Sequence, residues 1–315
     1  MPRISIDLVA NHILLFTNNG VGRGRETNDE NNDIRETILK NLLTPVVNAF
    51  LEDPTHGVAW QRLQALWRQA LVDLAVRCKI TGYNTISVNK RGGRKYNWDI
   101  DAIYGFADGS NKVVKVEFKF GGTSVANLPE FFNPAADKDF HSVLYAGFFY
   151  DNYMDELLSI YGLSARDKPA KDLYLKYIHK NTPSTACPFF KKLRDAEDAE
   201  IEVGRPKYKQ KTALAHRSIQ AYLAQYKDTT KLKTITDEFE RSQKDKHFLI
   251  YSDGAFHHDR IYDDELVVQS VIGVDGDYLV IQSACPTTKH RMLLRWKNHQ
   301  CVLFPAWQIS MVRSS

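Results

Sequence analysis

The chain has 315 residues, of which 43% are hydrophobic and 25% are charged, and its formal net charge is +4. These values are typical of a globular protein and exclude a disordered or collagen-like chain. No run of 18 apolar residues occurs, which excludes a membrane-spanning helix, and the first residues lack the small-residue cleavage site of a signal peptide.

Helices are predicted for the first part of the chain. Residues 19–33 are rich in Gly, Asn and acidic side chains and are expected to form a loop. Asp33 is predicted to cap a helix that continues to residue 52, with Glu36 as its capping-box partner. A second helix is predicted over 57–78, because its apolar residues recur with the helical period.

The pattern then changes to alternation of apolar and polar residues. Strands are predicted at 83–88, 96–106 and 111–120, separated by glycine-containing turns. Residues 121–245 are predicted to be mainly helical, with helices at 139–160, 170–181, 207–226 and 230–244. Alternation returns from residue 247, where five or so short strands are expected. The order predicts a mixed α+β (α/β) protein with a core of residues 1–245 and a small all-β module at 246–315.

The predicted hairpin of residues 96–120 gathers charged side chains on one face. Because successive side chains of a strand point to opposite sides, Asp99 and Asp101 share a face, and so do Lys115, Glu117 and Lys119. Folding the hairpin about the turn at Gly109 is predicted to place Asp101 opposite Glu117 and Asp99 opposite Lys119. A shift of this register by two residues would keep the same face.

Two opposed carboxylates repel each other unless a cation lies between them. Mg²⁺ prefers one or two protein carboxylates, with waters and phosphate oxygens completing its shell. Asp101 and Glu117, with Asp99, are therefore the predicted metal ligands, and Lys119 is predicted to orient the attacking water. The alternative interpretation is a solvent-exposed sheet face, on which Asp99 pairs with Lys119 and Glu117 pairs with Lys115 as ordinary surface ion pairs.

An Asp-Ile-Asp strand, a turn and a Val-Glu-Phe-Lys strand resemble the core motif of the PD-(D/E)XK, or restriction-endonuclease-like, nuclease superfamily. The resemblance implies a core sheet flanked by helices, with Mg²⁺ as cofactor (Mn²⁺ able to substitute) and DNA, rather than RNA, as substrate. It leaves open whether Asp99 or Asp101 is the principal ligand, although the predicted opposed pair favours Asp101. An additional acid from a preceding helix is expected in some members, for which Glu36 is a candidate.

A basic stretch follows about a hundred residues later. Residues 203–227 contain no acidic residue and interleave tyrosines with cations. We therefore expect phosphate contacts from this segment, or, alternatively, an ordinary solvated helix face. The candidate nucleic-acid-binding residues are Arg205, Lys207, Lys209, Lys211 and Arg217.

The sequence thus predicts a Mg²⁺-dependent deoxyribonuclease, an endonuclease that hydrolyses phosphodiester bonds. The alternative is a non-catalytic module of the same fold that binds nucleic acid or protein. By analogy, nucleases that cut both strands are commonly homodimers, and the C-terminal β module is a candidate surface for a protein partner. No membrane association is expected. The four cysteines are scattered without C-x-x-C spacing, which argues against structural zinc and predicts an intracellular, reducing compartment, the cytoplasm or nucleus.

Overall fold

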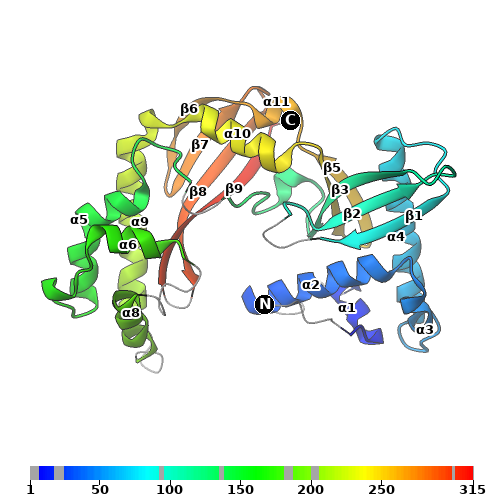
Figure 1. Ribbon diagram of the computed structural model, residues 1–315, viewed down its shortest axis with the longest axis horizontal. Coiled ribbons are helices and arrows are strands. Elements are labelled where there is room, and N and C mark those ends of the chain that lie inside the picture. The colour runs from blue at the N-terminus through cyan, green and yellow to red at the C-terminus, as the bar shows by residue number, and fades with distance from the viewer. Residues whose placement is uncertain are drawn as a thin grey trace. The chain divides into compact units, whose positions relative to one another are not determined.

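The computed structural model describes residues 7–17, 25–91, 96–134, 138–180, 187–199, 206–299 and 302–314. The chain divides into two compact units, each built from two separate stretches of sequence (Figure 1). The first unit comprises Met1–Leu128 and Gln243–Tyr262, and the second comprises Pro129–Ser242 and Asp263–Ser315.

A five-stranded sheet forms the centre of the first unit, in the order β1-β2-β3-β4-β5. Its strands are β1 (Thr85–Lys90), β2 (Ile100–Gly105), β3 (Asn111–Phe120), β4 (Lys246–Ser252) and β5 (Ala255–Arg260). The first three form an antiparallel meander, whereas β4 runs parallel to β3 and β5 is antiparallel to β4. A parallel neighbour requires a long crossover, and here the crossover contains residues Pro129–Ser242 of the second unit.

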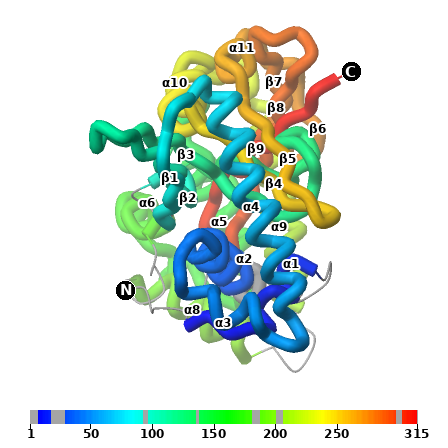
Figure 2. The backbone as a smooth tube through the Cα atoms, turned by 90° about the vertical axis from the view of Figure 1, so that its right-hand side faces the viewer, coloured from blue at the N-terminus to red at the C-terminus, as the bar shows by residue number. Residues whose placement is uncertain are grey.

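Helices cover one face of this sheet. They are η1 (Ala10–Ile13), α1 (Leu14–Thr17), α2 (Arg25–Asn41), η2 (Pro45–Val47), α3 (Asn48–Leu51) and α4 (Gly57–Arg77), and η3 (Val125–Asn127) follows β3. Fully buried residues of α2 and α4, such as Leu39 and Trp67, pack against Ile100, Val116 and other apolar residues of β1–β4. Figure 2 views this unit from the side that α4 covers. The opposite face of β2 and β3 therefore carries the charged residues.

The predicted helix at 57–78 and the predicted strand at 111–120 are confirmed as α4 and β3. The predicted cap at Asp33 is wrong, because α2 begins at Arg25 and Asp33 lies inside it. Its carboxylate accepts a hydrogen bond from the Lys90 ammonium of β1. Residues 25–33 of the predicted loop belong instead to this helix, whereas residues 19–24 lie outside the described residues.

The second unit combines helices with a four-stranded antiparallel sheet, in the order β6-β7-β8-β9. Its helices are α5 (Tyr145–Ile160), η4 (Ala165–Asp167), α6 (Lys171–Ile178), α8 (Pro188–Asp198), α9 (Pro206–Tyr226), η5 (Lys227–Thr229), α10 (Leu232–Gln243) and α11 (Asp263–Leu266). Its strands are β6 (Val268–Asp275), β7 (Tyr278–Ser283), β8 (Thr288–His299) and β9 (Val302–Arg313). Within the described part of the chain, no helix combines the length and apolar character needed to cross a bilayer.

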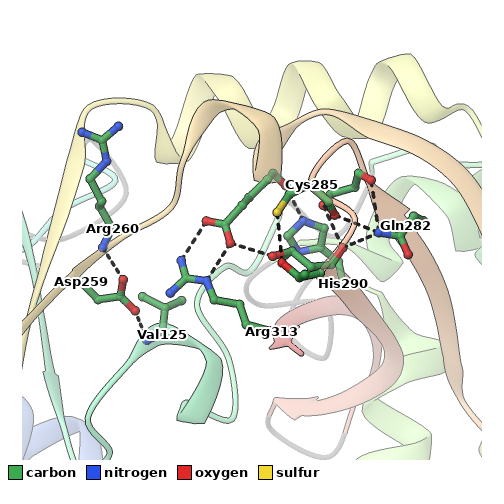
Figure 3. Close-up of polar contacts among 11 residues, drawn as sticks. Val125, Asp259, Arg260, Gln282, Cys285, His290 and Arg313 are labelled. Carbon is green, nitrogen blue, oxygen red and sulfur yellow. Dashed lines mark hydrogen bonds and ion pairs between the residues drawn. The ribbon is translucent and has the colours of Figure 1, made fainter. Parts of the chain in front are cut away.

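A buried polar network joins α11 to β8 and β9. The Glu265 carboxylate accepts hydrogen bonds from the Arg313 guanidinium at 2.7 and 2.8 Å and from the Thr288 hydroxyl at 2.8 Å. The Nε2 atom of His290 lies 2.6 Å from the Glu265 carbonyl oxygen, while its buried Nδ1 has no partner (Figure 3). His290 is therefore a neutral, structural histidine that donates through Nε2.

The predicted division at residues 245 and 246 differs from the observed one. Strands β4 and β5, which the prediction assigned to the C-terminal module, extend the sheet of the first unit. The rest of the predicted module, from Asp263 onward, belongs to the second unit together with Pro129–Ser242. Alternation identifies a strand but carries no information on which sheet it joins.

Candidate functional site: a carboxylate and lysine cluster

The β2–β3 hairpin has a different register from the predicted one. Asp101 lies opposite Lys115, and Ile100 lies opposite Val116. The predicted opposition of Asp101 with Glu117 is therefore wrong by two residues. Because the side-chain period of a strand is two, every charged residue of the hairpin keeps the predicted face.

Asp99 takes the position beside Glu117 that was expected for Asp101. Regular pairing between β2 and β3 ends at Ile100. The Asp99 backbone N–H still donates to the Val116 carbonyl at 3.1 Å, and its carboxylate accepts the Phe118 N–H at 3.0 Å. The side chain of Asp99 thus replaces a backbone partner where the two strands separate, which holds its carboxylate next to Glu117.

Asp101 is held in a different set of contacts. Its side chain is buried, with 4% of the residue exposed. One carboxylate oxygen lies 2.6 Å from the Arg91 Nε, and the other accepts the Trp98 indole N–H at 2.6 Å. Both oxygens are therefore already used, and Asp101 fixes the chain segment that leads into β2.

Glu117 lies between two ammonium groups. The Lys119 Nζ is 2.9 Å from one of its oxygens, and the Lys246 Nζ is 3.2 Å from the other. Lys246 is the first residue of β4 and is almost fully buried. Sequence reasoning missed Lys246, since no local pattern relates it to a residue in β3; its one sequence signal is a lysine at the start of a strongly apolar strand.

Glu36 approaches the cluster from α2. Its carboxylate lies 3.6 Å from the Lys90 Nζ, and Lys90 also binds Asp33 and the Thr37 hydroxyl. The charge of Glu36 acts on Asp99, because it contributes to raising the pKa of that carboxyl group. Glu36, the candidate for an additional acid from a preceding helix, thus lies near the site.

The carboxyl groups respond differently to their surroundings. Burial, reinforced by the charges of Glu117 and Glu36, raises the pKa of Asp99 well above its ordinary value. Burial alone would also raise the pKa of Glu117, but the ammonium groups of Lys119 and Lys246 outweigh it and lower that pKa. Burial lowers the pKa of Lys246, with Glu117 partly offsetting the effect. Glu117 is therefore the more strongly ionised carboxylate. At Asp99 the charge of Lys119 and the Phe118 N–H only partly offset burial and the two neighbouring carboxylates.

The donor set of this cluster fits a hard divalent cation. Among the described residues, no group of three or more His, Cys, Asp or Glu side chains has the geometry of a preformed metal site. Mg²⁺, however, usually takes only one or two protein carboxylates and keeps several waters. Asp99 and Glu117 supply such a pair, and the raised pKa of Asp99 marks a place where a cation would relieve repulsion.

The predicted nucleic-acid-binding residues have unequal surroundings. Lys211 is buried and ion-paired with Glu197, so it is unsuited to a surface phosphate contact. Arg217 is exposed and ion-paired with Glu156, and Lys209 is exposed on α9. Lys207 is half-buried on the same helix, and Arg205 lies outside the described residues. Glu197 and Glu156 thus neutralise part of the basic stretch.

The comparisons with known proteins add little to this geometry. No model of a known protein family and no curated protein sequence matches the chain. Among solved structures, the chain is similar to the restriction endonuclease MspI in complex with its cognate DNA, at 8% identity and a TM-score of 0.28. That match covers 76% of this chain and 78% of the other.

Proposed function

We propose that this protein is a divalent-metal-dependent endonuclease that hydrolyses DNA phosphodiester bonds. The observation that carries the proposal is the meeting of Asp99 with the Glu117 and Lys119 pair where β2 and β3 separate. The antiparallel meander, the parallel β4 and the flanking helices agree with the fold that the sequence resemblance implies. Asp99 and Glu117 would hold Mg²⁺, with Mn²⁺ able to substitute.

A bound divalent cation would polarise the phosphoryl oxygen and lower the pKa of a water molecule. The protein's own groups have complementary tasks. Lys119 presents an ammonium group beside Glu117, where it donates a hydrogen bond to the attacking water or to a phosphate oxygen. Lys246, buried behind Glu117, keeps that carboxylate ionised. Asp101, through Arg91 and Trp98, holds the backbone that positions Asp99.

Cleavage of supercoiled plasmid DNA tests the proposal. The wild-type chain should nick or linearise the plasmid with Mg²⁺ and not with EDTA. Glu117→Gln and Lys119→Met should each lower the rate by about two orders of magnitude, as expected for loss of a preorganised electrostatic group. Lys115→Met is the matched control, because Lys115 lies exposed on the same face of β3. Equal cleavage by all four proteins would refute the assignment.

One observation favours a second candidate, a non-catalytic module that binds nucleic acid. Glu117 already has two lysine partners, an arrangement that is stable without a metal ion. This candidate predicts salt-sensitive DNA binding without cleavage and no effect of Glu117→Gln on that binding. The predicted homodimer and the predicted protein partner remain proposals, which sedimentation and affinity capture with the full chain would test.

A further inference from the structure

A pocket of about 120 Å³ lies within the second unit, against α9 and the ends of β8 and β9. Tyr208, Ala215 and Ile219 of α9 contribute to one wall, at the spacing of a single helix face. Arg295 and Trp296 of β8 contribute to the other. The pocket therefore combines apolar surface and aromatic rings with a guanidinium group.

Arg295 stands out among the charged residues of this pocket. The neighbouring Lys211 is neutralised by Glu197, and Asp277 accepts hydrogen bonds from His216 and Gln220. By contrast, no hydrogen bond or ion pair joins the Arg295 side chain to another described residue, and its Nε atom is buried without a partner among them. A buried donor without an acceptor is costly, so an anion entering the pocket would gain a strong, charge-assisted partner.

The Trp296 side chain is held in place by two contacts. The Trp296 indole N–H donates to the Tyr145 hydroxyl at 2.8 Å, and its ring meets Phe149 edge to face at 4.9 Å between centroids. Tyr208 is 38% exposed, which gives an aromatic ring at the solvent side. Aromatic faces of this kind stack on nucleobases with little regard to sequence.

We propose that this pocket binds a nucleotide, with the Arg295 guanidinium holding the phosphate group and Trp296 and Tyr208 contacting the base. The planar guanidinium fork matches a phosphate group, which carries more negative charge and more acceptor oxygens than a carboxylate. The phosphate can belong to a free nucleotide or to an unpaired nucleotide of a strand. The proposal uses residues of the second unit alone and does not depend on the hydrolytic function.

Calorimetric titration of the full chain in EDTA tests it, because cleavage is then suppressed. The probes are deoxyadenosine monophosphate, deoxyadenosine, inorganic phosphate, acetate and a short 5′-phosphorylated single strand. We expect the monophosphate to bind more tightly than phosphate or the nucleoside, and acetate not to compete. Tighter binding of the oligonucleotide than of the monophosphate would assign the site to a strand, and the reverse would assign it to free nucleotides.

Variants separate the pocket from general charge effects. Arg295→Gln should weaken binding of the monophosphate by about tenfold or more. Arg291→Gln should leave it unchanged, since Arg291 lies on the same strand but is ion-paired with Asp275. Trp296→Leu should reduce nucleotide affinity to that of phosphate. Should Arg295→Gln not fold, judged by circular dichroism, Arg295→Lys should still weaken binding, because a lysine lacks the two-pronged fork.

Three results would overturn the proposal: absence of monophosphate binding at millimolar concentration, equal affinity in the wild-type and Arg295 variants, or competition by acetate as strong as that by phosphate. Each can occur whether or not the protein cleaves DNA. Conversely, loss of cleavage in Glu117→Gln with retained nucleotide binding would show that the two sites are separate.

Discussion

Asp99 and Asp101 stand two residues apart on the same face, yet the structure predicts opposite consequences for their replacement. In Asp99→Asn the side-chain oxygen can still accept the Phe118 N–H. Because burial and two neighbouring carboxylates raise the pKa of Asp99, a neutral side chain fits its surroundings better. We expect the free energy of unfolding to stay unchanged or to rise slightly. Mg²⁺-dependent cleavage should fall by about two orders of magnitude or more.

Asp101→Asn should act mainly on stability. The buried carboxylate accepts from both Arg91 and Trp98, whereas an amide offers one oxygen and turns an NH₂ group toward the other donor. Leaving a buried polar group unsatisfied costs about 1–3 kcal/mol, which corresponds to a fall of several degrees in Tm for a unit of this size. Where Asp101→Asn is folded at the assay temperature, it should retain most of the wild-type cleavage rate.

The assay combines thermal unfolding, followed by circular dichroism, with plasmid cleavage at saturating Mg²⁺, on the same preparations. Asp108→Asn is a matched control, because Asp108 lies exposed in the β2–β3 turn and accepts hydrogen bonds from Ser110. The reasoning would be refuted if Asp101→Asn abolished cleavage without loss of stability while Asp99→Asn cleaved like the wild type. That result would restore Asp101 as the principal ligand.

Two further predictions concern charge. Lys246→Met removes one of the two ammonium groups that lower the pKa of Glu117, so the acidic limb of the pH–rate profile should move to higher pH; an unmoved profile would contradict this role for Lys246. The second concerns the pH dependence of stability: burial lowers the pKa of His290 to about 4. Between its ordinary value and about pH 4 the unfolded chain therefore binds a proton that the folded chain does not. The free energy of unfolding should then decrease by about 3 kcal/mol as the pH falls through this range. Urea unfolding at a series of pH values measures it, and a His290→Gln variant with the same slope as the wild type would show that this histidine is not the cause.

Local patterns in the sequence were sufficient to locate the hairpin that carries the charged cluster. Strict alternation over Asn111–Phe120 places Glu117 and Lys119 on one face of the strand. A shift of the register by an even number of residues leaves that face unchanged. The same reasoning put both aspartates on that face, and helical periodicity located α4 within one residue of its observed end. These features depend on backbone geometry that each segment adopts by itself.

Which of Asp99 and Asp101 lies beside Glu117 depended on tertiary structure. The register of the hairpin is set by the pairing between its strands and by the point at which they separate. Lys246 comes beside Glu117 from 129 residues further along the chain, through a parallel pairing that no local pattern encodes. The burial of Lys211 against Glu197 and the unpartnered state of Arg295 likewise depend on how helices and strands pack. The sequence by itself determined which side chains share a face, since that follows from the two-residue period. Only the folded chain decided which of them meet, because contacts between distant segments are set by packing and not by local periodicity.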